Sequence, residues 1–390
     1  MKRMIERESG ATRNPHDADG PHAFSKGRMS RSVRRAVKVG TGLAVLVAMT
    51  ACDQVGIAVP DDIKPAVDTY KLSGMSVSDM TKPDIRRALV QLSREACNRD
   101  AMGRMAAQID ALGYRRESAS ALIGFVDRCG RADGFLSAAA NDLMAVSDFK
   151  GAVEVSDRLI ANNPSEPQYY FDRGRANEGW QRDDAALSDY MQALALSTNL
   201  ATVTSNLFIR IADLHAKAGR YCDSVSAIRM WVSADPERAD NTQAKGMIAQ
   251  YASHASCPST YAAGQESFAR QSGNTIRVKA KVNGIEGVFI VDTGASYVSL
   301  SEAFARRAQV PTEQAKRIRL QTANGARDGL LAQARAVKVG AVEASDVPVS
   351  VDAGGKSPYG DGIDGLLGQS FLSRFEVSFT PTRWSISQRS

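Results

Sequence analysis

The stretch that decides the fold of the C-terminal third is Phe289–Ser296, which reads FIVDTGAS. It begins as an apolar strand and runs directly into a turn, so Asp292 emerges where the strand ends. Gly294 permits the close backbone approach that a tightly packed loop needs. The sequence therefore predicts an acidic side chain on a glycine-containing turn at the edge of a β-structure.

Alternating strands surround this turn. Thr275–Val282, TIRVKAKV, alternates strictly and ends at Asn283-Gly284, a two-residue hairpin signal, after which Ile285–Val291 is the return strand. The only helix expected in the early part is Ser301–Ala308. Residues 268–390 are therefore predicted to form an all-β domain resembling a small barrel, whose further strands are Arg317–Gln321, Leu331–Val339, Val347–Val351 and Phe375–Phe379.

Two other segments of this region stand out. Thr322-Ala323-Asn324-Gly325 lies between two strand-like runs, and Asn324-Gly325 supplies a tight turn. Farther on, IDGLLG at 363–368 precedes a short predicted helix, Gln369–Arg374. The overlapping Gly360–Gly365 fits the formula GxGxxG, but no apolar strand precedes it and no full helix and second strand follow. We interpret it as a turn and not as a dinucleotide site.

These three motifs, in this order, strongly resemble the retropepsin-like aspartic proteases of bacterial type over residues 270–390. The resemblance implies that Asp292 is catalytic and that a peptide or protein is the substrate, with no cofactor and no metal. It also implies supporting roles. The loop around the catalytic residue would be Thr293, Gly294, Ala295 and Ser296, the flap over bound peptide would be Thr322, Ala323, Asn324 and Gly325, and the supporting segment would be Leu366, Leu367 and Gly368.

This chemistry requires two carboxylates. An aspartic peptidase activates water between two Asp side chains that share one proton, because like charges ~3 Å apart do not both ionise. The chain has one Asp-Thr-Gly and no second Asp-[Thr/Ser]-Gly, and Asp364 is interpreted as part of the supporting segment. The second carboxylate would then be Asp292 of another copy, so catalysis implies a homodimer through this domain.

Upstream, residues 84–265 are predicted to be an all-α repeat domain, because apolar residues recur at three- and four-residue spacing. Residues 168–198 resemble a tetratricopeptide repeat, and weaker units lie before and after them. The resemblance implies a solenoid surface for a protein partner. A generic array of helical hairpins is the alternative. The positions that carry the resemblance are Tyr170, Gly174, Ala186, Tyr190 and Ala193.

Cysteine and histidine usage narrows the chemistry further. Excluding Cys52, four cysteines allow three pairings, of which the helix map favours Cys97–Cys129 and Cys222–Cys257; four free thiols are the alternative. The region after residue 257 has neither His nor Cys, so it holds no Ser-His-Asp or Cys-His site of its own. No Cys pair at zinc spacing and no HExxH motif is present.

The N-terminal residues 1–51 are typical of an export signal. Residues 1–38 hold ten Lys/Arg and four acids, and residues 39–51 are uncharged and too short to span a bilayer. The rest of the chain has no net charge, so the basic excess is no sign of nucleic-acid binding. The run ends MTAC, which resembles a lipobox with Cys52 as the lipidated residue; a plain secretory signal is the alternative. Met1 and Met29 are both candidate starts.

The residue after Cys52 is Asp53, which resembles an inner-membrane retention signal, so we expect a lipid-anchored protein on the periplasmic side of a bacterial envelope. Residues 52–83 are predicted to be a polar tether. Two functions are compatible with the whole pattern. One is an envelope-anchored aspartic endopeptidase whose repeats recruit substrate or partner. The other is a non-catalytic repeat scaffold lipoprotein whose barrel only binds peptide or dimerises.

Overall fold

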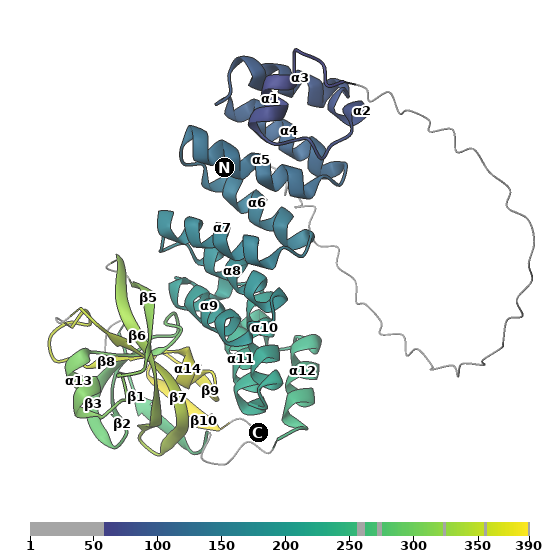
Figure 1. Ribbon diagram of the computed structural model, residues 1–390. Helices are drawn as coiled ribbons and strands as arrows, with labels where there is room; N and C mark the ends of the chain where they lie inside the picture. Colours follow the sequence, from purple (N-terminus) through teal and green to yellow (C-terminus); the bar gives the residue numbers. More distant parts are fainter. Residues whose placement is uncertain (1–57, 256–261, 271–274, 323–324, 355–356, 389–390) are drawn as a thin grey trace, which may run out of the picture. The chain divides into compact units, whose positions relative to one another are not determined.

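The structure, a computed structural model, describes residues 58–255, 262–270, 275–322, 325–354 and 357–388. The leader with Cys52 lies outside the described residues. The first part, up to Ala252, is helical, and the part from Gln265 onward is mainly β-structure (Figure 1). No helix of the described part combines the length and the apolar character needed to cross a membrane.

Successive helices pack against one another as antiparallel pairs along the chain (Figure 1). Where two helices of a pair approach closely, small residues face large ones, as the repeat pattern predicts: a Cβ on Gly174 would overlap the ring of the fully buried Tyr190. The helices are α1 (Lys64–Thr69), α2 (Val77–Met80), α3 (Pro83–Arg94), α4 (Arg99–Ala111), α5 (Arg115–Cys129), α6 (Asp133–Ala145), α7 (Phe149–Asn162), α8 (Pro167–Gly179), α9 (Asp183–Leu196), α10 (Ser205–Lys217), α11 (Tyr221–Ser233) and α12 (Thr242–Ala252), with 3₁₀ turns η1 (Leu200–Thr202) and η2 (Pro236–Arg238).

The predicted tether over residues 52–83 is wrong for its described part. α1 and α2 pack on the first repeat helices, and Tyr70 is buried against Phe125 with ring centroids 6.3 Å apart. The prolines misled the prediction, because Pro65 and Pro83 stand in the first turns of α1 and α3. The missing N–H of proline is not needed there, so proline starts a helix at such a position.

The disulfide Cys97–Cys129 is confirmed. It joins the segment before α4 to the last residue of α5, with Cα atoms 5.4 Å apart. Cys222 also takes part in a disulfide. Its predicted partner, Cys257, lies outside the described residues, so that pairing stays a prediction.

The C-terminal part forms a seven-stranded sheet in the order β2-β3-β8-β4-β7-β6-β5, and a three-stranded sheet in the order β1-β10-β9. β2, the first strand in this order, also pairs with β6, which closes the larger sheet into a barrel. β5, the last strand, lies outside this closure and is an edge strand. The strands are β1 (Gln265–Ala269), β2 (Arg277–Val282), β3 (Ile285–Val291), β4 (Val298–Leu300), β5 (Lys316–Thr322), β6 (Gly325–Val339), β7 (Val342–Asp352), β8 (Gly365–Leu367), β9 (Phe375–Phe379) and β10 (Arg383–Gln388).

The barrel core is built from the inward-facing residues of these strands and from two short helices, α13 (Glu302–Arg307) and α14 (Gln369–Leu372). The expected helix at 301–308 is present, with Ser301 as its N-cap. β1 begins three residues before the predicted domain start at 268, and it pairs with β10 through the whole register Gln265–Ala269. The strands β1, β4, β8 and β10 were not predicted. β1, β4 and β8 have only three to five residues, whereas β10, RWSISQ, alternates strictly over residues 383–387 and was overlooked.

Candidate active site

Strand β3 carries Asp292 to the surface of the barrel. Its apolar residues hold it in the core, and it pairs antiparallel with β2 on one side and parallel with β8 on the other. The backbone N–H of Asp292 donates to the Leu367 carbonyl at 3.0 Å, and its Oδ1 accepts from the Gly294 N–H at 2.9 Å. The carboxylate is half-buried and is fixed by the turn that the sequence predicts.

The supporting segment lies beside this loop, as the sequence analysis expected. Leu366 and Leu367 sit opposite Ile290 and Val291 in the parallel β8–β3 pairing. Gly368 follows where a side chain would overlap the backbone carbonyl oxygens of Ala295 and Tyr297, so only glycine fits. The absence of a side chain at Gly368 therefore permits the close approach of this segment to the loop.

Gln369 holds the loop from beneath, a role that the sequence analysis missed. Its Nε2 donates to the Thr293 carbonyl at 2.9 Å, and its own backbone N–H donates to the Ala295 carbonyl at 2.8 Å. The next residue continues the contact, because the Ser370 N–H donates to the Ser296 carbonyl at 3.0 Å. Gln369 is 2% exposed, so its amide is dedicated to the loop. The signal in the sequence was a polar residue directly after GLLG.

Asp364 has a structural role. Its Oδ2 accepts from the Val288 N–H at 2.9 Å, and its Oδ1 lies 2.9 Å from the Arg307 guanidinium. It thus ties β3 to the chain before β8 and to α13. Both carboxylate oxygens accept hydrogen bonds. Asp364 therefore anchors the supporting segment and is not a second water-activating group.

The tip of the loop is open to solvent. Thr293 and Gly294 are exposed, whereas Ser296 is buried. Among the hydrogen bonds of the described residues, none uses the Thr293 hydroxyl. An exposed tip beside a half-buried carboxylate leaves room for a second protein surface at this position.

The predicted flap is a hairpin of β5 and β6. Thr322 pairs with Gly325 at its end, and the Thr322 hydroxyl donates to the Gly325 carbonyl at 2.8 Å. Ala323 and Asn324, the tip that links them, lie outside the described residues. Lower in the hairpin, Arg327 donates two hydrogen bonds of 2.9 Å to the buried carboxylate of Asp352 on β7. This pair links β6 to β7 at the third residue pair below the tip of the hairpin.

Helix α9 of the repeat part packs directly on strand β5 and on the end of the catalytic loop. The Gln192 side chain bonds both backbone groups of Arg319 on β5: its Oε1 accepts from the N–H at 2.8 Å and its Nε2 donates to the carbonyl at 2.6 Å. Behind the loop, the Ser296 hydroxyl donates to the Leu194 carbonyl and the Tyr297 hydroxyl to the Met191 carbonyl, at 2.8 and 3.0 Å. No motif of the sequence predicts this contact.

An apolar cluster completes the contact between α9 and the barrel. It comprises Ala195, Tyr297, Ile318 and Leu320, with Met191 and Leu331 at its margin. Burial raises the pKa of the Tyr297 phenol, so this hydroxyl stays a hydrogen-bond donor at any ordinary pH. The end of the catalytic loop, at Ser296 and Tyr297, and strand β5 of the flap, called the flap strand below, are thus both held by helix α9.

One histidine lies near this contact. Burial, with a smaller effect of the neighbouring Arg220, lowers the pKa of His215 on α10 to about 4. The Arg220 Nε–H donates to His215 Nδ1 at 3.1 Å, which fixes a neutral imidazole with its proton on Nε2. His215 is therefore a packing residue at neutral pH and not a proton-transfer group of the barrel.

Comparisons with known proteins find similarities for both parts of the chain. Residues 278–374 match the family described as "gag-polyprotein putative aspartyl protease". A retropepsin-like aspartic protease from Rickettsia conorii is a similar solved structure, with 24% identity, 32% of this chain and 90% of that chain covered, and a TM-score of 0.25. The family match lies within the C-terminal barrel, which in this respect resembles aspartyl proteases.

The helical part resembles tetratricopeptide-repeat proteins. A thermophilic TPR protein from Thermus thermophilus is 17% identical over 50% of this chain and 98% of that chain, with a TM-score of 0.31. The curated "Small glutamine-rich tetratricopeptide repeat-containing protein 2" of Mycosarcoma maydis is 29% identical over 101 residues. That match spans 26% of this chain and 28% of the relative's length.

Proposed function

We propose that this chain is an aspartic endopeptidase whose catalytic pair consists of two Asp292 residues from two copies. The observation that carries the proposal is the geometry of the loop: a half-buried carboxylate at the end of β3, fixed by the amide of Gly294, beside an exposed Thr293-Gly294 tip. In such a pair one carboxylate takes a proton from water while the other, protonated, holds the substrate carbonyl.

The homodimer follows from the number of suitable acids. Asp364 is used by the β3 backbone and Arg307, and the chain has one Asp-Thr-Gly. A two-fold axis beside the exposed tip would bring the two Asp292 side chains together, and Thr293 of each copy would contact the opposite loop. The pair would titrate as a unit with one shared proton.

The repeats and the leader complete the proposal. The repeat helices, which pack on strand β5 of the flap, would bring a protein substrate or partner to the barrel. Lipidation of Cys52 would anchor the protein on the periplasmic side of a bacterial inner membrane. Labelling of the parent, but not of Cys52→Ser, by a radioactive fatty acid in cells would support the anchor; equal labelling of both would remove it.

The first experiment compares soluble protein beginning after Cys52 with its Asp292→Asn variant on an unbiased peptide library, read by mass spectrometry. We expect cleavage by the parent and none by Asp292→Asn. The matched control is Asp361→Asn, the same chemical change at an exposed turn of the same barrel, which should cleave like the parent. Absence of cleavage in a preparation shown to be dimeric would favour the scaffold, with the barrel as a binding module.

A mixing experiment tests the shared pair. If parent and Asp292→Asn subunits exchange freely and are mixed in equal amounts, about one quarter of the dimers contain two intact subunits. The activity should therefore fall to about half of what the same amount of parent gives alone. Activity that stays proportional to the amount of parent would mean that each copy works by itself, and would refute the pair.

A further inference from the structure

The outer edge of strand β5, which faces away from β6, forms hydrogen bonds with the side chain of Gln192 in the way that it would with a neighbouring strand. The Gln192 amide accepts from the Arg319 N–H and donates to the Arg319 carbonyl, which is the pattern of a residue on a neighbouring β-strand. Both backbone groups of Arg319 therefore point away from β6. Because backbone direction alternates along a strand, those of Gln321, two residues on, point the same way.

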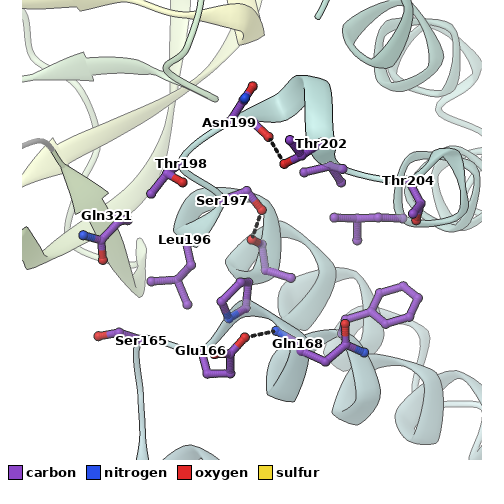
Figure 2. Close-up of a pocket in the computed structure, with 15 residues that line it drawn as sticks. Ser165, Glu166, Gln168, Leu196, Ser197, Thr198, Asn199, Thr202, Thr204 and Gln321 are labelled. Atoms are coloured by element: carbon purple, nitrogen blue, oxygen red, sulfur yellow. Dashed lines mark hydrogen bonds between the residues drawn. The ribbon is translucent and has the colours of Figure 1, made fainter. Parts of the chain in front are cut away.

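The edge continues past Gln192 into a groove. Beside Gln321 lies a groove of about 450 Å³, formed by the start of α8, the end of α9 and the turn into α10. Figure 2 shows Gln321 on the strand side of this groove, facing the residues after Leu196, with Ser165 and Glu166 along another side. A chain lying in the groove would run along the free part of the β5 edge.

The lining suits polypeptide better than a charged ligand. Hydroxyl and amide side chains dominate it, among them Ser197, Asn199 and Gln321, while Phe171 and Val203 add apolar surface. Glu166 is the one charged residue among those that line it, so the groove offers no cation to a phosphate or a nucleic acid. Backbone N–H and C=O groups with mixed side chains match this surface.

We propose that an extended segment of the protein substrate, outside the cleavage site, adds as a strand to the outer edge of β5 at Gln321 and lies in this groove. This inference rests on the proposed function in naming the bound chain a substrate. Addition at this edge would engage the flap strand from its outer side, continuing the contact that Gln192 makes. The repeat helices would thereby select unfolded or extended substrates.

The test measures binding without cleavage. Full-length Asp292→Asn protein is immobilised and offered tryptic peptides of carboxymethylated β-casein, and the peptide retained best is synthesised and titrated. Two further variants act on the groove by different means. Thr198→Trp fills it from an exposed position, and Gln321→Pro removes the outward N–H at an edge strand, where proline is tolerated.

The matched control is Arg317→Pro, which removes an outward N–H of the same parity on the same strand but away from the groove. We expect Thr198→Trp and Gln321→Pro each to weaken binding by about tenfold and Arg317→Pro to leave it unchanged. Two versions of the synthetic peptide are also compared, one methylated on the backbone nitrogens of its odd residues and one on those of its even residues. One version should bind the unmodified groove about tenfold more weakly, and the other should bind it as the unmethylated peptide does.

Retention of no peptide, unchanged binding in the groove variants, or an equal loss in Arg317→Pro would overturn the inference. Loss in Thr198→Trp alone would also overturn it, because side-chain binding without strand addition would then explain the groove. The proposed function is judged separately, by cleavage of the same peptides by the parent. Strand addition without cleavage would refute the peptidase and keep the binding edge.

Discussion

Replacing Gln192 by alanine should loosen the flap strand without touching the catalytic loop. The side chain is 7% exposed and makes two short hydrogen bonds to one residue of β5. Alanine removes both and leaves the N–H and carbonyl of Arg319 facing a small void beside α9. Among the described strands, β5 pairs with β6 alone, so no second strand there replaces the lost bonds.

Each hydrogen bond of this kind contributes about 0.5–1.5 kcal/mol, so the two together stabilise the edge by about 1–3 kcal/mol. We expect the free energy of opening at the Arg319 amide, measured by native-state hydrogen exchange, to fall by that amount. The exchange rate of this amide should rise by roughly 5- to 150-fold. Amides of β2 and β3 in the barrel core should keep their protection.

The matched control is Gln250→Ala, the same replacement at an exposed position of α12. It should change stability by less than about 0.5 kcal/mol and leave the Arg319 amide unaffected. An unchanged exchange rate at Arg319 in Gln192→Ala would refute the reasoning, because it would mean that the amide pairing does not hold the strand. Equal loss of protection over the whole barrel would refute it too.

Three further predictions concern stability. Removing the Cys97–Cys129 bridge by serine replacement opens a loop with a sequence separation of 32, and should lower the free energy of unfolding of the repeat part by about 3–4 kcal/mol in urea titrations. The pKa of His215 is about 4 in the folded state, below its value in the unfolded state, so the unfolded state binds the proton first as the pH falls. The free energy of unfolding should therefore decrease between about pH 6.5 and pH 4, by about 3 kcal/mol from this group. Gly368→Ala should lower the melting temperature of the barrel and abolish cleavage, because the added methyl overlaps backbone.

Each of these has its own check. The disulfide prediction fails if the reduced parent is as stable as the oxidised one. The pH effect is taken as the difference between the parent and His215→Asn, so that the carboxylates common to both cancel; parallel pH curves would contradict it. For Gly368→Ala the control is Gly246→Ala on an open face of α12, which should raise stability by about 0.5–1 kcal/mol.

The elements that local patterns predict are those whose own residues decide them. The β2–β3 hairpin follows from strict alternation and Asn283-Gly284, and Asn283 and Gly284 both have the positive φ that such a turn requires. The turn at Asp292 follows from an apolar strand that meets Asp-Thr-Gly. Gly174 and Tyr190 meet because the repeat spacing places them on facing helices. In each case the partners are close in sequence.

Other parts of the site depend on partners far away in the chain. Nothing local marks Gln192 as the partner of a strand more than a hundred residues later, because a glutamine on a helix usually faces solvent. Gln369 was overlooked for a similar reason, because its side-chain amide donates a hydrogen bond to the carbonyl of Thr293, 76 residues earlier in the chain. Residues 58–83 lacked a period because helices of four and six residues are too short to show one.

The sequence by itself determined the division into helical repeats and a β-barrel, the Asp292 turn with its supporting segment, and the bridge between Cys97 and Cys129. These depend on periodicity, turn chemistry and loop spacing, which short stretches encode. Only the tertiary structure decided that α9 holds both the flap strand and the end of the catalytic loop, and that the loop tip is exposed. Burial and hydrogen bonding between distant segments are set by how whole domains pack, and no local pattern records that packing.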